Sequence, residues 1–241
     1  MAKYTLLEMV QIILSDMDAE EVNAIGDTSE STQVAWIIRD TFYNIVSNRQ
    51  IPELRKLIKL TSLSNSSYPT HFRYPDNTQG ITNVWYEDVN GDYQEIKYLD
   101  PVDFLARVDG IEANYTEVLD ISGGTKLRIV NNEDPSFYTS FDDTHIVMNS
   151  HDSSVDTTLT EAKSRAFGTV VPNFTITDSF TPEIDHNYFP LLLAESKSVA
   201  MSLLTGGSDP KIEQAARRQR VRVQNDKYNT VIKRGISHYG R

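Results

Sequence analysis

Side chains able to bind a metal gather in one short stretch of the chain. It holds four aspartates and two histidines, namely Asp142, Asp143, His145, His151, Asp152 and Asp156. Carboxylates and imidazoles ligate many divalent metals, and on a strand Asp143 and His145 would share one face. The spacing matches neither the H-E-x-x-H zinc motif nor a facial triad. Polar loop residues beside an edge strand are therefore the favoured interpretation, and an enzyme using this cluster is the alternative.

Two other segments look like parts of ligand-binding loops. Asp88, Asn90 and Asp92 resemble the first half of a calcium loop, but its twelfth position, which should be a bidentate glutamate, is Leu99. The Ser-Gly-Gly-Thr run at residues 122–125 lacks the lysine and glycine spacing of a P-loop. Tight turns explain both segments. There is no cysteine and no G-x-S-x-G motif, so we predict a non-enzymatic protein with no cofactor and no metal.

Charge is unevenly distributed along the 241 residues. The chain carries −11 in total, yet residues 209–241 carry +6 and the first 208 residues carry −17. An acidic body repels phosphate, so it should not bind nucleic acid non-specifically. The basic C-terminal arm, residues 209–241, could instead meet phosphate or an acidic protein partner.

Apolar residues are too scattered for a membrane protein. The longest apolar run, around residues 189–194, is about six residues, whereas a bilayer span needs roughly 20. The first residues also lack the layout of a signal peptide. We therefore expect no membrane partner and a cytosolic location.

Both ends of the chain show helical periodicity. A first helix is indicated by the spacing of Leu6, Met9, Val10, Ile13 and Met17, with Thr5 and Glu8 as a capping box. Asp27 and Glu30 predict the start of a second helix. Two more helices are expected after Pro190 and from Pro210, with no structure of its own expected after Thr230.

The middle of the chain is rich in Thr, Ser, Asn, Asp, Tyr and Val. Strands are expected at residues 81–88, 93–99, 126–130, 137–141, 145–149 and 169–176. Asn90-Gly91 predicts a type I′ hairpin turn, and Asp100-Pro101 a short helix over residues 101–108. The predicted fold is α+β: a helical bundle from residues 1–60 and 186–241, with an inserted antiparallel β-sandwich-like domain at residues 61–185.

The basic arm is the most informative candidate site. Four arginines cluster on its predicted helix, and the chain beyond them mixes basic, aromatic and apolar residues. Apolar and aromatic residues gain little by remaining in water, which favours docking on a partner over a solvated helix end. The residues that we expect to dock are Arg217, Arg218, Arg220, Arg222, Lys227, Tyr228, Val231, Lys233, Arg234, Tyr239 and Arg241.

The order of elements and several C-terminal motifs resemble one known family, the head-to-tail adaptors of short-tailed bacteriophages of the tail tubular protein A type. The motifs are FPLLLAES at residues 189–196, Ala200, EQAARRQ at residues 213–219, RG at residues 234–235 and YGR at residues 239–241. They cover about the last 55 residues, and the N-terminal helices match in pattern only. The predicted β region of about 120 residues is large for this family.

The resemblance implies a structural protein located in the virion at the head-tail junction, and in the host cytoplasm during assembly. Such adaptors form a homo-oligomeric ring, typically a dodecamer, beneath the portal protein. Their C-terminal segment docks into the portal, the tail nozzle protein binds the other side, and genomic DNA passes through the bore. Tail fibres are a further candidate partner here.

Three alternatives remain open besides the connector. The protein could be another virion tail or fibre-attachment component, although trimeric repeats and heptads are missing. It could bind nucleic acid through its basic arm, with an affinity that falls steeply with salt. The third alternative is the enzyme acting through the aspartate and histidine cluster.

Overall fold

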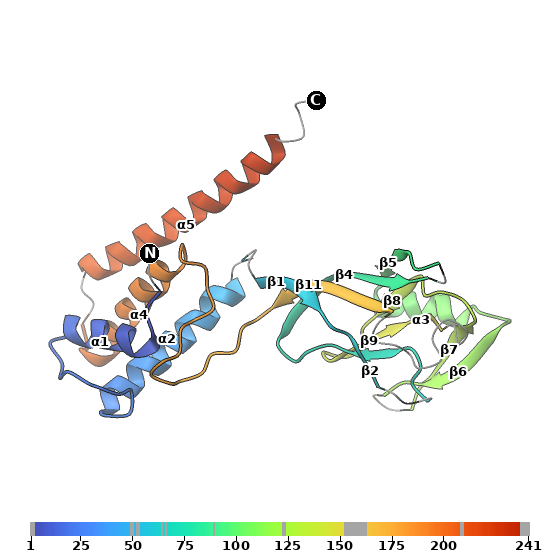
Figure 1. Ribbon diagram of the computed structural model, residues 1–241, viewed down its shortest axis with the longest axis horizontal. Helices are drawn as coiled ribbons and strands as arrows, with labels where there is room; N and C mark the ends of the chain where they lie inside the picture. Colours follow the sequence, from blue (N-terminus) through green and yellow to red (C-terminus); the bar gives the residue numbers. More distant parts are fainter. Residues whose placement is uncertain are drawn as a thin grey trace. The chain divides into compact units, whose positions relative to one another are not determined.

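The protein is a mixed α+β chain whose contacts divide it into two compact units (Figure 1). Unit 1 comprises Met1–Glu53 and Pro172–Arg241, and unit 2 comprises Leu54–Val171. The computed structural model describes residues 3–48, 51, 54–63, 65, 67–88, 90–121, 124–151, 163–207 and 210–236, and within them the side chains of residues 48 and 226–236 are not described.

Unit 1 is helical. Its helices are α1 (Leu6–Asp16), α2 (Ser29–Asn48), α4 (Phe189–Leu204) and α5 (Pro210–Ile236). The predicted capping box is confirmed at α1, where the Glu8 backbone N–H donates to Thr5 Oγ1 and the Thr5 N–H donates to the Glu8 carboxylate. Helices α1, α2 and α4 pack against one another, and α5 packs on α4. The fully buried core side chains include Leu6, Ile13, Ile38, Phe42 and Leu191.

The start of α2 differs from the expectation by one residue. Ser31 N–H donates to Thr28 Oγ1 at 3.0 Å, and Thr28 N–H donates to Ser31 Oγ at 3.1 Å, so Thr28 rather than Asp27 opens the helix. The Asp27 carboxylate instead accepts from the backbone N–H groups of Asn23 and Ala24, both at 2.8 Å. Asp27 therefore stabilises the preceding turn.

The segment that returns from unit 2 packs onto the helices. Leu6 N–H donates to the Phe180 carbonyl at 2.7 Å, and Ile25 N–H donates to Asp178 Oδ1 at 2.9 Å. The rings of Phe174 and Phe42 lie 5.2 Å apart. The strand predicted at residues 169–176 is therefore wrong beyond Val170, because Phe174 takes its partners from α2: its N–H donates to the Tyr43 hydroxyl, and its ring packs on Phe42.

Unit 2 contains helix α3 (Pro101–Asp109) and the strands of two sheets. The strands are β1 (Arg55–Ile58), β2 (Thr61–Ser62), β3 (His71–Arg73), β4 (Thr78–Glu87), β5 (Tyr93–Tyr98), β6 (Tyr115–Leu119), β7 (Lys126–Asn131), β8 (Phe137–Thr139), β9 (His145–Met148), β10 (Ser150–His151) and β11 (Ser164–Val170). In the described part of the chain, one sheet has the order β1-β11-β4-β5-β8-β9-β3-β2 and the other β10-β7-β6.

The sheets are mixed, whereas purely antiparallel pairing was expected. β5 pairs with β8 in parallel, and β10 pairs with β7 in parallel. Parallel neighbours need a long crossover connection. Helix α3 and the β6–β7 hairpin lie between β5 and β8 in the chain, and this insertion lets the chain return in the same direction.

The predicted hairpin between β4 and β5 is present, but its turn is longer than the expected two residues. Asp88 N–H donates to the Asp92 carbonyl, and Gly91 N–H donates to the Asp88 carbonyl. Gly91 has φ +86°, and the described non-glycine residues with positive φ do not include Asn90. This pattern is that of a three-residue loop with glycine in the left-handed region. The backbone N–H groups of Asp92 and Asn90 donate to the Asp88 carboxylate and hold its pKa below the ordinary value.

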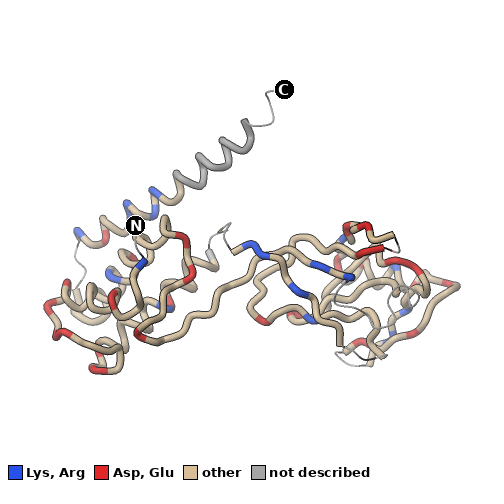
Figure 2. The backbone as a smooth tube through the Cα atoms, in the orientation of Figure 1, with Lys and Arg blue, Asp and Glu red and all other residues tan. Residues whose placement is uncertain are grey.

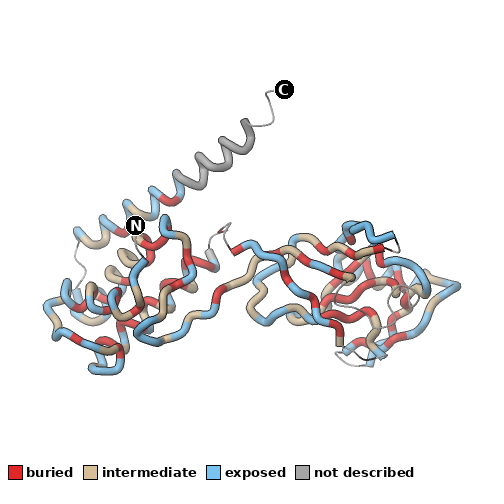
Figure 3. The backbone as a smooth tube through the Cα atoms, in the orientation of Figure 1, coloured by how far each residue is buried: buried red, intermediate tan, exposed pale blue. Residues whose placement is uncertain are grey.

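Two apolar clusters form the core of unit 2 (Figure 3). The first includes Ile58, Phe72, Val84, Ile96 and Ile146 from the large sheet. The second joins α3 to the smaller sheet and to Val147 of β9, through Phe104, Val108, Val118, Leu127 and Ile129. Asp100 caps α3 by accepting from Val102 N–H at 3.1 Å, which confirms the predicted short helix.

Candidate docking surface

One face of α5 packs on α4 and fixes the start of the basic arm. Ala216 and Val223 are buried, and Ile212 and Gln219 are half-buried. Their spacing of four, three and four residues places them on one side of the helix. Because α5 packs on α4, the remaining faces of its described part point away from this contact.

Arg220 makes the strongest polar contact between the two helices. Its guanidinium donates through Nη2 to Glu195 Oε2 at 2.6 Å and through Nε to Glu195 Oε1. Donating to the Glu195 carboxylate raises the pKa of Arg220, although burial acts in the opposite direction. A bidentate pair of this kind fixes geometry as well as adding energy. Among the four arginines clustered at residues 217–222, Arg220 thus bonds within its own unit.

The other three arginines of this cluster are exposed on α5. Arg217 Nη2 lies 3.7 Å from Glu213 Oε2, in a loose pair one helical turn apart. Arg218 and Arg222 are exposed four residues apart, and no acidic side chain of the described residues is paired with them. Val221, between them, is 53% exposed. This face can therefore offer two cations and an apolar contact to a partner.

The remaining predicted docking residues lie beyond the described side chains. Lys227, Tyr228, Val231, Lys233 and Arg234 fall within the bounds of α5. Tyr239 and Arg241 fall outside the described residues. The helix continues to Ile236, so the expectation of no independent structure after Thr230 is wrong as far as that residue, and residues 237–241 lie outside the described part of the chain. At 1.5 Å per residue its 27 residues span about 40 Å.

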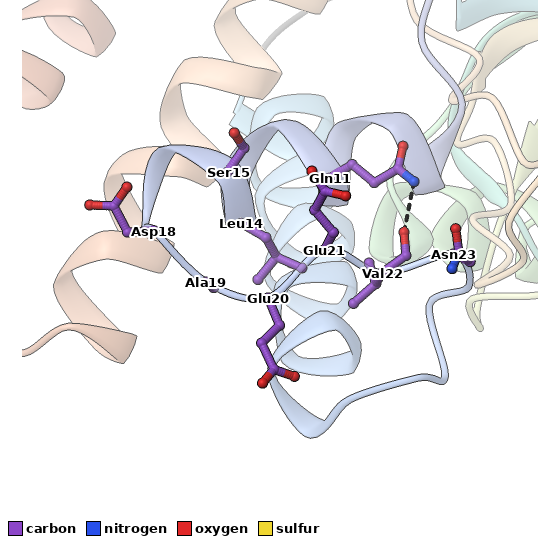
Figure 4. Close-up of a pocket in the computed structure, with 9 residues that line it drawn as sticks. All are labelled: Gln11, Leu14, Ser15, Asp18, Ala19, Glu20, Glu21, Val22 and Asn23. Carbon is purple, nitrogen blue, oxygen red and sulfur yellow. Dashed lines mark hydrogen bonds between the residues drawn. The ribbon is translucent and has the colours of Figure 1, made fainter.

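A cavity of about 570 Å³ lies in unit 1 between α1 and the loop that follows it (Figure 4). Gln11 Nε2 donates to the Val22 carbonyl at 2.8 Å across its wall. Asp18, Glu20 and Glu21 also line it, and Figure 4 shows these carboxylates spread along the loop. The cavity is therefore acidic, but its carboxylates do not converge on one point.

The aspartate and histidine cluster forms a local turn. His145 Nδ1 lies 2.8 Å from Asp142 Oδ2, and the backbone N–H groups of Thr144 and His145 donate to Asp142 Oδ1. Burial raises the pKa of Asp142, but these hydrogen bonds outweigh it and leave the pKa below its ordinary value. Asp143 is exposed. His151 ends β10, whereas Asp152 and Asp156 lie outside the described residues.

A buried histidine and aspartate pair was missed by the sequence reasoning. His71 on β3 has a fully buried side chain, and its Nε2 lies 3.5 Å from Asp120 Oδ1 just after β6. Burial lowers the pKa of His71 more than the neighbouring Asp120 raises it. The two residues are 49 positions apart, and no local sequence pattern indicates that they pair.

No family model and no curated protein matches the chain. Among the described residues, no group of three or more His, Asp or Glu side chains could hold a metal. In the same part of the chain, no helix combines the length and the hydropathy that a membrane crossing requires.

Proposed function

We propose that this protein is a structural connector between the head and tail of a short-tailed bacteriophage. It forms a homo-oligomeric ring, expected to be a dodecamer, between the portal protein and the tail nozzle protein. The ring lines the DNA channel, retains the genome and lets it pass during ejection. The protein works in the virion after assembly in the host cytoplasm, without enzymatic activity.

The observation that carries the proposal is the exposed basic face of α5, defined by Arg218, Val221 and Arg222. Helix α5 is anchored to α4 by Arg220 and by its buried stripe, so this face is held on a rigid support. A helix that presents cations beside an exposed valine suits a groove with acidic walls and an apolar floor. The resemblance assigns such a docking role to the C-terminal segment.

The charge of the rest of the chain supports a DNA channel. Residues 1–208 carry −17, and Figure 2 shows Asp and Glu spread through the described parts of both units. Carboxylates repel phosphates, so a ring built from these residues would conduct DNA without binding it. The finer architecture that fits this role is a helical bundle from both chain ends with an inserted β-sandwich, the latter reaching toward the nozzle or tail fibres.

The test is native mass spectrometry and particle imaging of the chain, alone and mixed with its cognate portal protein. We expect a ring to form on the portal with the natural chain. The double variant Arg218→Glu/Arg222→Glu should lose portal binding by at least tenfold, because two attractive contacts become repulsive. The double variant Lys3→Glu/Lys97→Glu makes the same change in net charge at two residues that do not belong to α5, and it should bind normally.

A second candidate function, nucleic-acid binding, rests on the same exposed arginines. It predicts that the chain shifts labelled DNA, that binding weakens steeply with salt, and that the portal has no effect. Binding to DNA by the natural chain, with no ring on the portal, would overturn the connector proposal. A chain that binds neither would favour another tail or fibre-attachment component.

A further inference from the structure

A small cavity opens in unit 2 where two strands of the large sheet separate. β4 pairs with β11 from Thr78 to Tyr86, but it pairs with β5 only from Val84 to Glu87. The end of β5 pairs instead with β8, where Tyr98 lies opposite Tyr138. The first half of β4 and the end of β5 therefore border a cavity of about 150 Å³.

The cavity is lined by aromatic rings and neutral polar groups. Three tyrosines contribute, together with two hydroxyl side chains, one amide and a glycine; the polar and aromatic members are Tyr74, Thr78, Gln79, Tyr98, Tyr138 and Ser140. No Lys, Arg, Asp, Glu or His is among the described lining residues. Pockets for drug-sized ligands measure roughly 300–1,000 Å³, so this one has room for a single small ring.

Tyr98 is placed to stack on such a ring. Its side chain is 56% exposed, whereas Tyr138 beside it is only 5% exposed. The two rings meet edge to face, with centroids 5.5 Å apart and an interplanar angle of 65°. Tyr138 thus supports Tyr98 from within the core, and the exposed part of the Tyr98 ring remains available for an apolar surface.

Polar groups with unused hydrogen-bonding capacity surround the tyrosines. Thr78 Oγ1 is buried and has no hydrogen-bond partner among the described residues. Ser140 Oγ is already engaged, because it hydrogen-bonds with the carbonyls of Asp142 and His145 and with Tyr74, and it thereby holds this part of the lining in place. Gln79 is exposed and adds an amide, which both donates and accepts. A ligand with several hydroxyl groups would satisfy these groups.

The electrostatic surroundings disfavour an anionic ligand. Burial raises the pKa of Tyr74, a hydrogen bond with Ser140 lowers it, and the negative charges of Asp142 and Asp143 raise it further. Two carboxylates thus lie near Tyr74 at one side of the cavity, and the described lining contains no cation that could pair with an anion. Phosphate or carboxylate groups would be repelled there, which argues against nucleotides and acidic sugars.

We propose that this cavity binds one neutral pyranose ring of a saccharide. The C–H face of the ring stacks on Tyr98, while its hydroxyl groups bond with Thr78 and Gln79. A pyranose combines an apolar face with a polar edge, and this lining offers both kinds of contact within a space for one ring. The inference is independent of the connector proposal, because it uses only residues of unit 2.

Saturation-transfer NMR and calorimetry on the full chain test the inference. The probes are the methyl pyranosides of glucose, galactose, mannose and N-acetylglucosamine, with uridine and adenosine as neutral aromatic comparisons. We expect transfer to at least one pyranoside. Tyr98→Ala should weaken its binding by about tenfold, because the stacking surface is lost, whereas Tyr98→Phe keeps the ring and should bind within about threefold of the natural chain.

The matched control is Tyr93→Ala, which removes an exposed tyrosine from the opposite end of the same strand and should leave binding unchanged. Circular dichroism checks that each variant folds. If Tyr98→Ala is unfolded, Gln79→Ala replaces it, and that variant should also weaken binding. Transfer to no pyranoside, transfer to the nucleosides alone, or equal binding by the Tyr98→Ala and natural chains would overturn the inference.

Discussion

At the scale of single residues, Arg220 shows how an arginine in a basic cluster can serve the fold. Glu195 is mostly buried and receives both of its hydrogen bonds from the half-exposed Arg220. We expect Arg220→Ala to lower the free energy of unfolding by about 0.5–1 kcal/mol, a value set by solvent screening of the exposed partner. Arg217→Ala removes a looser and more exposed pair, so it should change stability by less than about 0.5 kcal/mol.

Urea unfolding of Arg220→Ala and Arg217→Ala measures the difference in their free energies of unfolding, and hydrogen exchange reports on α5 separately. Faster exchange confined to α5 is expected for Arg220→Ala. Equal stability of the two variants would contradict the anchoring role, and Glu195→Gln tests it from the other side of the pair.

His71 predicts a pH dependence of stability. Burial lowers its folded pKa below 6.5, so the unfolded chain binds a proton more readily than the folded chain. The contribution of His71 to the free energy of unfolding should therefore be constant above pH 6.5 and fall as the pH drops below that value. Asp120 and Asp142 oppose the effect by attracting the proton, and His145 adds to it. Chemical unfolding between pH 5 and pH 8 measures the slope, which His71→Gln should reduce.

At the scale of elements, the β4–β11 pair depends on one glycine. A Cβ atom at Gly168 would lie 2.2 Å from the Gly80 carbonyl oxygen and 2.8 Å from Ile58 Cδ1. The register shifts beside this glycine, between Phe167 and Gly168, so the strands approach closely there. Gly168→Ala should destabilise unit 2 by about 1–3 kcal/mol or prevent its folding, because the backbone cannot move away easily.

Gly80 provides the matched control, because it lies on β4 opposite Thr169, the residue after Gly168, and a Cβ there would meet no atom within 4 Å. Gly80→Ala should change the free energy of unfolding by less than about 0.5 kcal/mol. Thermal unfolding of the two variants side by side checks the prediction. A Gly168→Ala protein as stable as Gly80→Ala would show that the strands can separate at this point.

Local signals predicted the elements that depend on neighbouring residues. Thr5 with Glu8 and Asp100 with Pro101 each mark a helix start that the structure has, since both signals act within one turn. The hairpin was found through Gly91, although its turn type was wrong because the Asp88 side chain organises a longer loop. These successes concern contacts between residues that are close in sequence.

Strands that form only by pairing with distant segments of the chain were not predicted. β1 and β3 are short, and each exists because a strand far along the chain pairs with it, β11 in one case and β9 in the other. The partners of the docking residues on α5 were not predicted for the same reason. The basic cluster was visible in the sequence, but the assignment of Arg220 to Glu195 needed the packing of α5 on α4. Hydrophobic periodicity predicts which face of a helix is buried, but it does not predict which element packs against that face.

At the scale of the whole molecule, the chain enters and leaves unit 2 through two paired strands. β1 and β11 are antiparallel neighbours, with Arg55 opposite Thr169, so the two ends of unit 2 lie about 5 Å apart. Both apolar clusters of unit 2 are built from its own residues. Residues 54–171 should therefore fold on their own, and calorimetry of the full chain should show two separate transitions.

Because β1 and β11 are paired, residues 54–171 can be deleted and the two segments of unit 1 joined across a short gap. Joining Glu53 to Pro172 by a short Gly-Ser linker spans only the gap that β1 and β11 leave, so the helices should keep their packing. Because the proposed docking face lies on α5, this shortened chain should still bind the portal, while saccharide binding should follow the isolated residues 54–171. A shortened chain that folds but no longer binds the portal would show that docking requires the β unit, and the basic face of α5 would then be insufficient.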